Sequence, residues 1–215
     1  MIIDTHCHLD DERYREDLDE VIKRSFAQNI RGIIIPGADI KDLSRAQEIA
    51  HSYENIYFAA GVHPYHIEDY DEKILRKFLE DEKCIAVGEC GLDYFRLPDE
   101  PREKEEEKKR QIAIFRLHVR LAKAFKKPLI VHIRDANDDS KKVLLEENAS
   151  EVGGVLHCYN ASKHLLDLAY KGFYFGIGGV LTFKNAKALV EVLPLIPRDK
   201  LLIETDGPYL TRIPI

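Results

Sequence analysis

The chain has 215 residues, of which 45% are hydrophobic and 33% are charged, and its formal net charge is −6. This composition is typical of a folded domain with one core, and we expect residues 1–215 to form a single domain. The acidic balance excludes a broad basic surface that would hold long nucleic acid non-specifically. No apolar run reaches the roughly 18 residues of a membrane helix. The first residues do not resemble a secretory signal, so we expect a cytoplasmic protein without membrane contact.

Short apolar runs alternate with helical patterns along the chain. The runs that we predict as strands are 1–3, 32–35, 57–62, 85–89, 128–132, 154–157, 173–177 and 201–206. The segments that we predict as helices lie near 15–28, 41–52, 71–81, 101–126, 139–148, 162–171 and 184–193. Because parallel strands need a crossover helix, eight such units predict an α/β fold, a TIM-like (β/α)8 barrel. The competing doubly wound sheet usually carries a glycine-rich phosphate turn, which this sequence lacks.

Polar side chains stand at the C-terminal ends of the predicted strands, where the active sites of such barrels lie. In strand order they are His6, His8, His63, Glu89, His132, His157 and Asp206. Residues two apart in an extended strand point to the same side, so His6 and His8 are expected to face one cavity. Four imidazoles and two carboxylates that converge on one mouth are typical of a two-metal hydrolytic centre.

The segments that hold these residues resemble the TatD family of metal-dependent hydrolases and nucleases, within the amidohydrolase-like barrels. The matching motifs are residues 2–10, 61–64, 88–94, 128–136, 157–159 and 204–208. They occur in order and span nearly the whole chain. The resemblance implies a TIM-like barrel, a divalent-metal centre and phosphodiester hydrolysis, commonly as a 3′–5′ deoxyribonuclease.

The resemblance also implies which side chains hold two divalent metal ions, which would be Mg²⁺, Mn²⁺ or Zn²⁺. It assigns His6, His8 and Asp206 to one metal, His132 and His157 to the second, and Glu89 to the bridge between them. The strand order agrees with this assignment. Strands one and eight become neighbours when a barrel closes, and strands five and six are neighbours as well.

Our hypothesis for the reaction is that the two metals lower the pKa of a shared water, which then attacks the phosphodiester. Asp206 and Glu89 would be catalytic, with Asp206 orienting the water or accepting its proton. His63 would contact a phosphate or protonate the leaving group. Glu204, two residues before Asp206, is a candidate partner to a ligand histidine. A buried structural carboxylate is the alternative for Glu204.

Substrate contacts are expected at the same mouth. Arg134 shares the side of its strand with His132 and is a candidate for holding a phosphate. Aromatic side chains in the neighbouring loops are candidates for stacking on unpaired bases, and the group is Tyr65, Tyr94, Phe95 and Tyr159, with Arg96 beside them. Packing beneath the loops is the alternative for each tyrosine. These residues predict a focal grip on a nucleic acid substrate, either single-stranded DNA or strand ends.

The four cysteines have neither disulfide-type nor metal-type spacing, and we expect reduced thiols. Three of them stand next to a candidate ligand: Cys7 lies between two histidines, Cys90 follows Glu89, and Cys158 follows His157. Strand alternation is expected to turn their side chains away from the ligands. We predict that no cysteine binds metal.

The sequence stops at Ile215, nine residues past Asp206. A complete barrel of this kind runs to about 250 residues and ends with a helix after the eighth strand. We therefore expect the last C-terminal helix to be lacking. Residues 211–215 also depart from the family pattern. Apolar surface is then expected beside strands eight and one.

Two other functions stay open at this point. The same metal centre could act on another ester or amide, such as a lactone or an aminoacyl bond. Alternatively, a catalytically inactive barrel could act as a binding module. Release of nucleotides from single-stranded DNA with Mg²⁺ or Mn²⁺ separates the nuclease from the first alternative, and metal content after purification separates it from the second.

Overall fold

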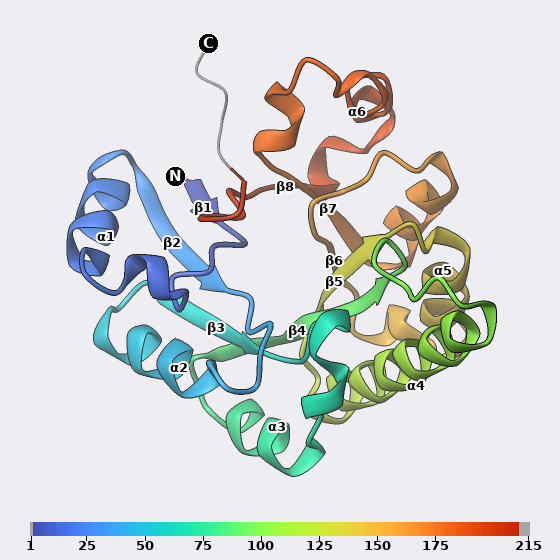
Figure 1. Ribbon diagram of the computed structural model, residues 1–215. Helices are drawn as coiled ribbons and strands as arrows, with labels where there is room; N and C mark the ends of the chain where they lie inside the picture. The colour runs from blue at the N-terminus through green and yellow to red at the C-terminus, as the bar shows by residue number, and fades with distance from the viewer. Residues whose placement is uncertain (1, 211–215) are drawn as a thin grey trace.

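The computed structural model describes residues 2–210, so the first residue of the predicted first strand and the tail 211–215 lie outside the described part. Eight strands form one parallel sheet whose spatial order follows the sequence. They are β1 (Ile2–Asp4), β2 (Ile30–Ile35), β3 (Ile56–Ala60), β4 (Cys84–Asp93), β5 (Leu129–Arg134), β6 (Gly154–Leu156), β7 (Phe173–Ile177) and β8 (Leu201–Ile203). Figure 1 shows the sheet curled into a barrel with the helices around it, as predicted.

The α-helices lie outside the barrel (Figure 1). They are α1 (Leu18–Ala27), α2 (Leu43–Ser52), α3 (Glu72–Leu79), α4 (Pro101–Phe125), α5 (Asn137–Glu146) and α6 (Lys187–Val192). Tighter 3-10 helices are η1 (Glu12–Tyr14), η2 (Pro64–Asp69), η3 (Ala149–Glu151), η4 (Lys163–Lys171), η5 (Gly179–Thr182), η6 (Leu193–Leu195) and η7 (Arg198–Lys200). The helix predicted at 162–171 is therefore a 3-10 helix, and the one predicted at 184–193 is shorter.

Strand β4 is longer than the predicted strand 85–89, because it stays paired with β5 as far as Asp93 and Arg134. A glycine permits this close pairing. At Gly91, φ is +143°, and an added Cβ would lie 2.0 Å from the carbonyl oxygen of His132. The pairing holds Glu89 and His132 on adjacent strands that approach each other closely.

The barrel closes mainly through the residues that follow β1 and β8, together with a hydrogen bond from the Thr5 N–H to the Ile203 carbonyl of β8 at 3.1 Å. The backbone N–H of Asp206 donates to the His6 carbonyl at 2.8 Å, and that of His8 donates to the Gly207 carbonyl at 2.7 Å. Cys7 and Gly207 form a parallel bridge between these bonds. Strands one and eight are thus neighbours, as predicted, and the backbone on both sides of His6 and His8 remains in a sheet-like pairing.

Asp4 ties the same two chain segments together with its side chain. The buried carboxylate accepts hydrogen bonds from the Thr205 N–H at 3.0 Å and from the Thr205 hydroxyl at 2.6 Å. It also accepts a longer bond from the His6 N–H at 3.3 Å. One carboxylate therefore joins the ends of β1 and β8 immediately beside the strand-end histidines.

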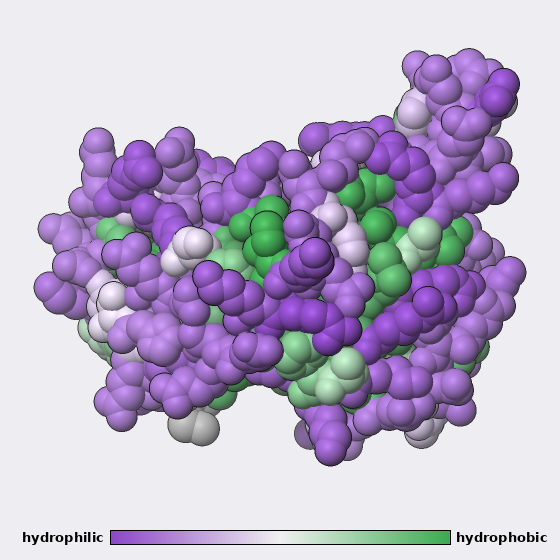
Figure 2. All heavy atoms as spheres, turned by 90° about the horizontal axis from the view of Figure 1, so that it is seen from below, coloured by the Kyte–Doolittle hydropathy of each residue, from purple (hydrophilic) through white to green (hydrophobic). Residues whose placement is uncertain are grey.

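Apolar side chains are exposed on β1 and β8, as predicted. Ile3 is 44% exposed and Ile203 is 57% exposed. No helix follows β8 within residues 2–210. Elsewhere the surface is mixed, and Figure 2 shows a face that is mainly hydrophilic, with apolar residues in separate areas. Within the described part of the chain, no helix combines the length and hydropathy needed to cross a membrane.

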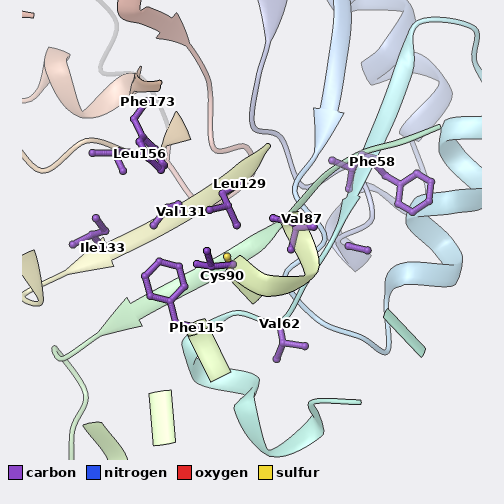
Figure 3. Packing of buried hydrophobic residues seen from close by; sticks show 14 of the residues in the cluster. Phe58, Val62, Val87, Cys90, Phe115, Leu129, Val131, Ile133, Leu156 and Phe173 are labelled. Carbon is purple, nitrogen blue, oxygen red and sulfur yellow. The ribbon is translucent and has the colours of Figure 1, made fainter. Parts of the chain in front are cut away.

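The apolar core fills the space between the barrel strands and the helices. Figure 3 shows Phe115 of α4 and Val131 of β5 close to Cys90 of β4. The Cys90 thiol is buried there and lies 3.6 Å from the Ile130 carbonyl oxygen. Strand alternation has thus turned Cys90 toward the helix layer, so the neighbouring Glu89 faces the barrel interior.

Candidate metal centre

The ends of β1, β4 and β8 bring imidazoles and carboxylates into one buried cluster. The Nε2 atoms of His6 and His8 are 3.2 Å apart. The Glu89 Oε2 atom lies 3.3 Å from His6 Nε2, and the Asp206 Oδ1 atom lies 3.5 Å from His8 Nε2. Segments that are about 200 residues apart in the sequence therefore converge on one point.

Glu89 also faces the histidines from β5 and β6 with its second oxygen. The Oε1 atom is 3.1 Å from His132 Nδ1 and 3.8 Å from His157 Nε2. The His157 ring is stacked on that of His6, with 3.4 Å between centroids, and its centroid is 6.3 Å from that of His132. One carboxylate thus contacts both halves of the cluster, which is the arrangement that a bridging ligand needs.

Within residues 2–210, four sets of ligand-type atoms at the cluster are compact enough to hold an ion. They are His6, His8 and Asp206; His6, Glu89 and His157; His63, Asp93 and His132; and His157, Cys158 and Glu204. The first set coincides with the ligands expected for one metal. His132 and His157, the pair expected for the second metal, do not occur together in any of these sets, although both histidines contact Glu89.

The electrostatics of the cluster favour a cation. Burial by itself raises the pKa of Glu89, but His6 and His157 outweigh it and hold that pKa well below its usual value. The pKa values of Glu204 and Asp206 are also lowered against burial, by histidines. Within residues 2–210, no lysine or arginine forms an ion pair with these carboxylates. Buried anions without a fixed cation require protons or metal ions, and a set of imidazoles and carboxylates suits divalent transition metals.

Protonation of the His157 ring offsets part of the negative charge of these carboxylates. Burial lowers its pKa, but Glu204 and Glu89 outweigh burial and raise the pKa to about 10. In contrast, burial and His157 together lower the pKa of His6. Metal ligation needs the deprotonated imidazole, so a bound divalent cation would replace the proton on His157. The donor set therefore fits a metal centre.

Glu204 lies behind His157, as a partner to a ligand histidine would. Its Oε1 atom is 3.2 Å from His157 Nδ1 and accepts a hydrogen bond from the Cys158 N–H at 2.6 Å. Gly176 on β7 leaves the room that the carboxylate occupies, because an added Cβ would lie 2.2 Å from Glu204 Oε2. The contact predicted between Glu204 and a strand-end histidine is present.

His63 lies at the edge of the cluster, where it precedes η2. Its Nδ1 atom accepts from the Tyr65 N–H at 3.1 Å, and its Nε2 atom is 3.9 Å from Glu89 Oε1. Burial, followed by the neighbouring His132, lowers the pKa of His63 to about 3. The ring is therefore neutral near pH 7, and its one hydrogen is on Nε2, which faces the cluster.

Two arginine–aromatic pairs are exposed beside the cluster, from the ends of β3, β4 and β5. The Arg134 Cζ atom lies 3.6 Å from the centroid of the Phe95 ring, and the Arg96 Cζ atom lies 5.0 Å from that of Tyr65. Phe95 is 57% exposed and Tyr65 is 36% exposed. Four of the predicted substrate contacts, Arg134, Phe95, Arg96 and Tyr65, are thus exposed.

Two other predicted contacts are not brought to the mouth. Tyr159 is only 4% exposed, and its hydroxyl donates to the Ser162 carbonyl at 2.7 Å. The Tyr94 hydroxyl donates to Asp139 on α5 at 2.8 Å, away from the cluster. Both tyrosines therefore pack beneath the loops, which was the alternative expected for each of them.

The sequence analysis did not assign Asp93, although it contacts the cluster directly. Its Oδ2 atom is 2.8 Å from His132 Nε2, and the residue is almost completely buried. The predicted strand 85–89 placed Asp93 in a loop. Extending that strand to its true end would have placed Glu89 and Asp93, four residues apart, on the same face.

Cys158 departs from the alternation that was predicted for the cysteines. Its backbone φ is +43°, in the left-handed region, so its side chain does not follow the strand. The thiol lies within 4.8 Å of ligand-type atoms of His157 and Glu204. That no cysteine binds metal therefore remains a prediction, and for Cys158 alternation does not support it.

A family model described as TatD related DNase matches residues 3–215. The chain belongs to the TatD-related DNase family. The uncharacterized metal-dependent hydrolase YabD of Bacillus subtilis is 41% identical over 218 residues, which span all of this chain and 83% of YabD. The 3′-5′ ssDNA/RNA exonuclease TatD of Escherichia fergusonii is 32% identical, with 97% of this chain and 80% of that protein covered.

The solved structures agree with this assignment. The crystal structure of YjjV, a TatD homologue from Escherichia coli, superposes with a TM-score of 0.88 at 29% identity, and covers 99% of this chain and 81% of YjjV. The resemblance drawn from the sequence motifs is confirmed. The protein is a metal-dependent hydrolase of the TatD family, and its buried histidine and carboxylate cluster is consistent with metal binding.

Proposed function

We propose that this TatD-family hydrolase is a 3′–5′ deoxyribonuclease that removes nucleotides from the ends of single-stranded DNA, with RNA as a second substrate. The observation that carries the proposal is the position of the two exposed arginine–aromatic pairs directly beside the buried cluster. A relative at 32% identity is named as a 3′-5′ ssDNA/RNA exonuclease, which supports the same substrate class.

The proposal includes a centre of two divalent metal ions. The proposed ligands are His6, His8 and Asp206 for one ion, His132 and His157 for the other, and Glu89 between them. When bound, such ions lower the pKa of a water molecule and offset negative charge on the phosphate. The distances of both Glu89 oxygens to the surrounding imidazoles support the bridging position.

Asp206 is the proposed proton acceptor. Burial raises its pKa, but a hydrogen bond from His8 and the charge of His157 keep it lower than usual. The carboxylate is therefore ionised near neutral pH. Its Oδ1 atom faces His8 and His6, and the side chain is partly accessible at the mouth. It can accept a proton from an attacking water.

His63 is proposed to hold the phosphate rather than to protonate the leaving group. The Tyr65 N–H occupies its Nδ1 atom, so the hydrogen of the neutral ring is on Nε2. A pKa of about 3, caused first by burial and then by His132, leaves no second proton at neutral pH. The Nε2–H can donate to a phosphate oxygen beside the cluster.

The two exposed arginine–aromatic pairs are proposed to bind the end of the DNA strand. The Arg134 Cζ atom lies 3.6 Å from the centroid of the Phe95 ring, and the guanidinium N–H groups can bind a phosphate. Within residues 2–210, neither Arg134 nor Arg96 forms an ion pair with a carboxylate. Exposed rings of Phe95 and Tyr65 can stack on unpaired bases, which gives a grip that tolerates different sequences. Such a local grip agrees with a chain whose overall charge is −6.

The test uses 5′-labelled single-stranded DNA with the purified chain after metal depletion and addition of Mg²⁺, Mn²⁺ or Zn²⁺. We expect shortening by one nucleotide at a time from the 3′ end. Arg134→Ala should raise KM about 10-fold or more, because a charged hydrogen bond to phosphate is lost. Arg102→Ala is the matched control, because this exposed arginine lies at the start of α4 and, among residues 2–210, pairs only with Glu106.

The outcomes also separate the alternative functions. A protein that binds metal but leaves DNA and RNA intact while hydrolysing a lactone or aminoacyl ester would contradict the nuclease proposal and retain the metal centre. A protein that retains no metal and hydrolyses none of these substrates would support the binding module.

A further inference from the structure

Asp93 is a buried carboxylate that connects the cluster to the loop that follows β4. Its Oδ2 atom is 2.8 Å from His132 Nε2, and its Oδ1 atom accepts from the Phe95 N–H at 2.9 Å. The backbone N–H of Asp93 donates to Gln111 Oε1 on α4 at 2.9 Å. Two hydrogen bonds therefore hold the carboxylate and a third holds the backbone, and the residue is 1% exposed.

His132 lies between two carboxylates, with Asp93 at Nε2 and Glu89 at Nδ1, 2.8 Å and 3.1 Å away. A neutral imidazole has one N–H and one lone pair, and an ionised carboxylate can only accept, so Asp93 and Glu89 compete for the one hydrogen. An ion at Nδ1 would displace a hydrogen from that atom, and the remaining Nε2–H would then donate to Asp93. The opposite tautomer would place a lone pair against Asp93 and a hydrogen toward the ligand position.

We propose that Asp93 is a positioning residue that fixes the Nε2–H tautomer of His132 and so presents its Nδ1 lone pair to a metal ion beside Glu89. Through the Phe95 N–H, the same carboxylate holds the backbone of the exposed ring proposed to stack on substrate. Carboxylates that accept from the far nitrogen of a ligand histidine orient the ring and raise its basicity. The inference rests on the metal centre proposed above.

An alternative is that His63, Asp93 and His132 hold an ion of their own, since their ligand-type atoms lie close together. The hydrogen bonds favour the positioning role. The Asp93–His132 distance of 2.8 Å is that of a hydrogen bond, and Nδ1 of His63 is already occupied by the Tyr65 N–H. The nitrogens that would face this ion, Nε2 of both rings, are those that carry hydrogens.

Asp93→Asn tests the tautomer with little change in shape. The amide oxygen can still accept from the Phe95 N–H, but the amide NH₂ can only donate to His132 Nε2, which moves the ring hydrogen to Nδ1. In metal-depleted protein labelled with ¹⁵N-histidine, at a pH where the ring is neutral, NMR should show a larger share of the Nε2–H tautomer of His132 in the wild type than in the variant.

Metal titration gives the second readout. The wild type should bind two ions, and Asp93→Asn should bind one with unchanged affinity and the other about 10- to 100-fold more weakly. Gln111→Met is the matched control, because it removes the acceptor of the Asp93 N–H without touching His132. It should lower the thermal unfolding midpoint and keep both metal affinities.

Three results would overturn the proposal: a share of the Nε2–H tautomer that does not fall in the variant, affinities for both ions that are the same in the variant as in the wild type, or a third ion that only the wild type binds. The NMR result is independent of the reaction. A wild-type chain that does not cleave DNA would overturn the proposed function but leave the test of Asp93 intact.

Discussion

His118 on α4 offers the sharpest test of how the helix layer supports the mouth of the barrel. It is fully buried, and its Nε2 atom accepts a hydrogen bond from the Val62 N–H at 3.0 Å. Its Nδ1–H donates to the Ile114 carbonyl at 2.9 Å. Val62 directly precedes His63, so this ring fixes the backbone that leads to the edge of the cluster. The bond from Val62 needs the neutral imidazole, because a protonated Nε2 has no lone pair to accept it.

Protonation of His118 should destabilise the folded protein. Burial lowers its pKa from 6.5 to about 4, against a small opposing effect of the Ile114 carbonyl. A tenfold change in proton affinity is worth about 1.4 kcal/mol, so this difference corresponds to about 3 kcal/mol. Because the unfolded chain binds the proton more readily, the stability from His118 is complete above pH 6.5. It is lost as the pH falls toward 4.

The measurement is urea unfolding of the wild type, His118→Gln and His118→Ala at pH 7 and pH 4.5. A glutamine oxygen can still accept from the Val62 N–H, so at pH 7 His118→Gln should lose no more than about 1.5 kcal/mol. His118→Ala leaves that N–H unpaired beside a cavity and should lose about 3–4 kcal/mol.

The pH comparison isolates the titration of one ring, because the other groups are common to the proteins. Between pH 7 and 4.5, the wild type should lose about 2–3 kcal/mol more than His118→Gln. Equal losses for the two proteins would refute the argument, since they would show that the buried ring does not control acid sensitivity. A fully stable His118→Ala protein would refute the role of the Val62 bond.

Two further substitutions test the cluster and the closure of the barrel. Glu89→Gln removes the charge shared by both halves of the cluster, so metal affinity and kcat should each fall by about 100-fold or more. Metal affinities from titration and steady-state rates near those of the wild type would contradict the bridging role. Asp4→Ala removes the acceptor of two Thr205 hydrogen bonds at the junction of β1 and β8, and should lower the free energy of unfolding by about 2–4 kcal/mol. Urea unfolding measures that loss, and an unchanged midpoint would show that backbone bonds alone close the barrel.

Local patterns in the sequence were sufficient to predict the barrel fold and most of the polar residues at the C-terminal ends of its strands. Eight apolar runs with intervening helical patterns predicted the strands and helices, because side-chain periodicity depends only on neighbours along the chain. In a parallel barrel all strands end at the same face, so the polar residue after each run was placed at a common mouth before any distance was known. His6, Glu89 and His157 were found in this way.

Only the tertiary structure decided which atoms meet within that mouth. Asp93 was missed because pairing with β5 extends β4 past its apolar run. Cys158 was misplaced because a left-handed backbone interrupts alternation. Tyr159 is buried against Phe175, where a pattern of exposed loop residues cannot place it. Such outcomes depend on strand register, backbone bends and contacts between distant segments, and no short window of sequence contains them.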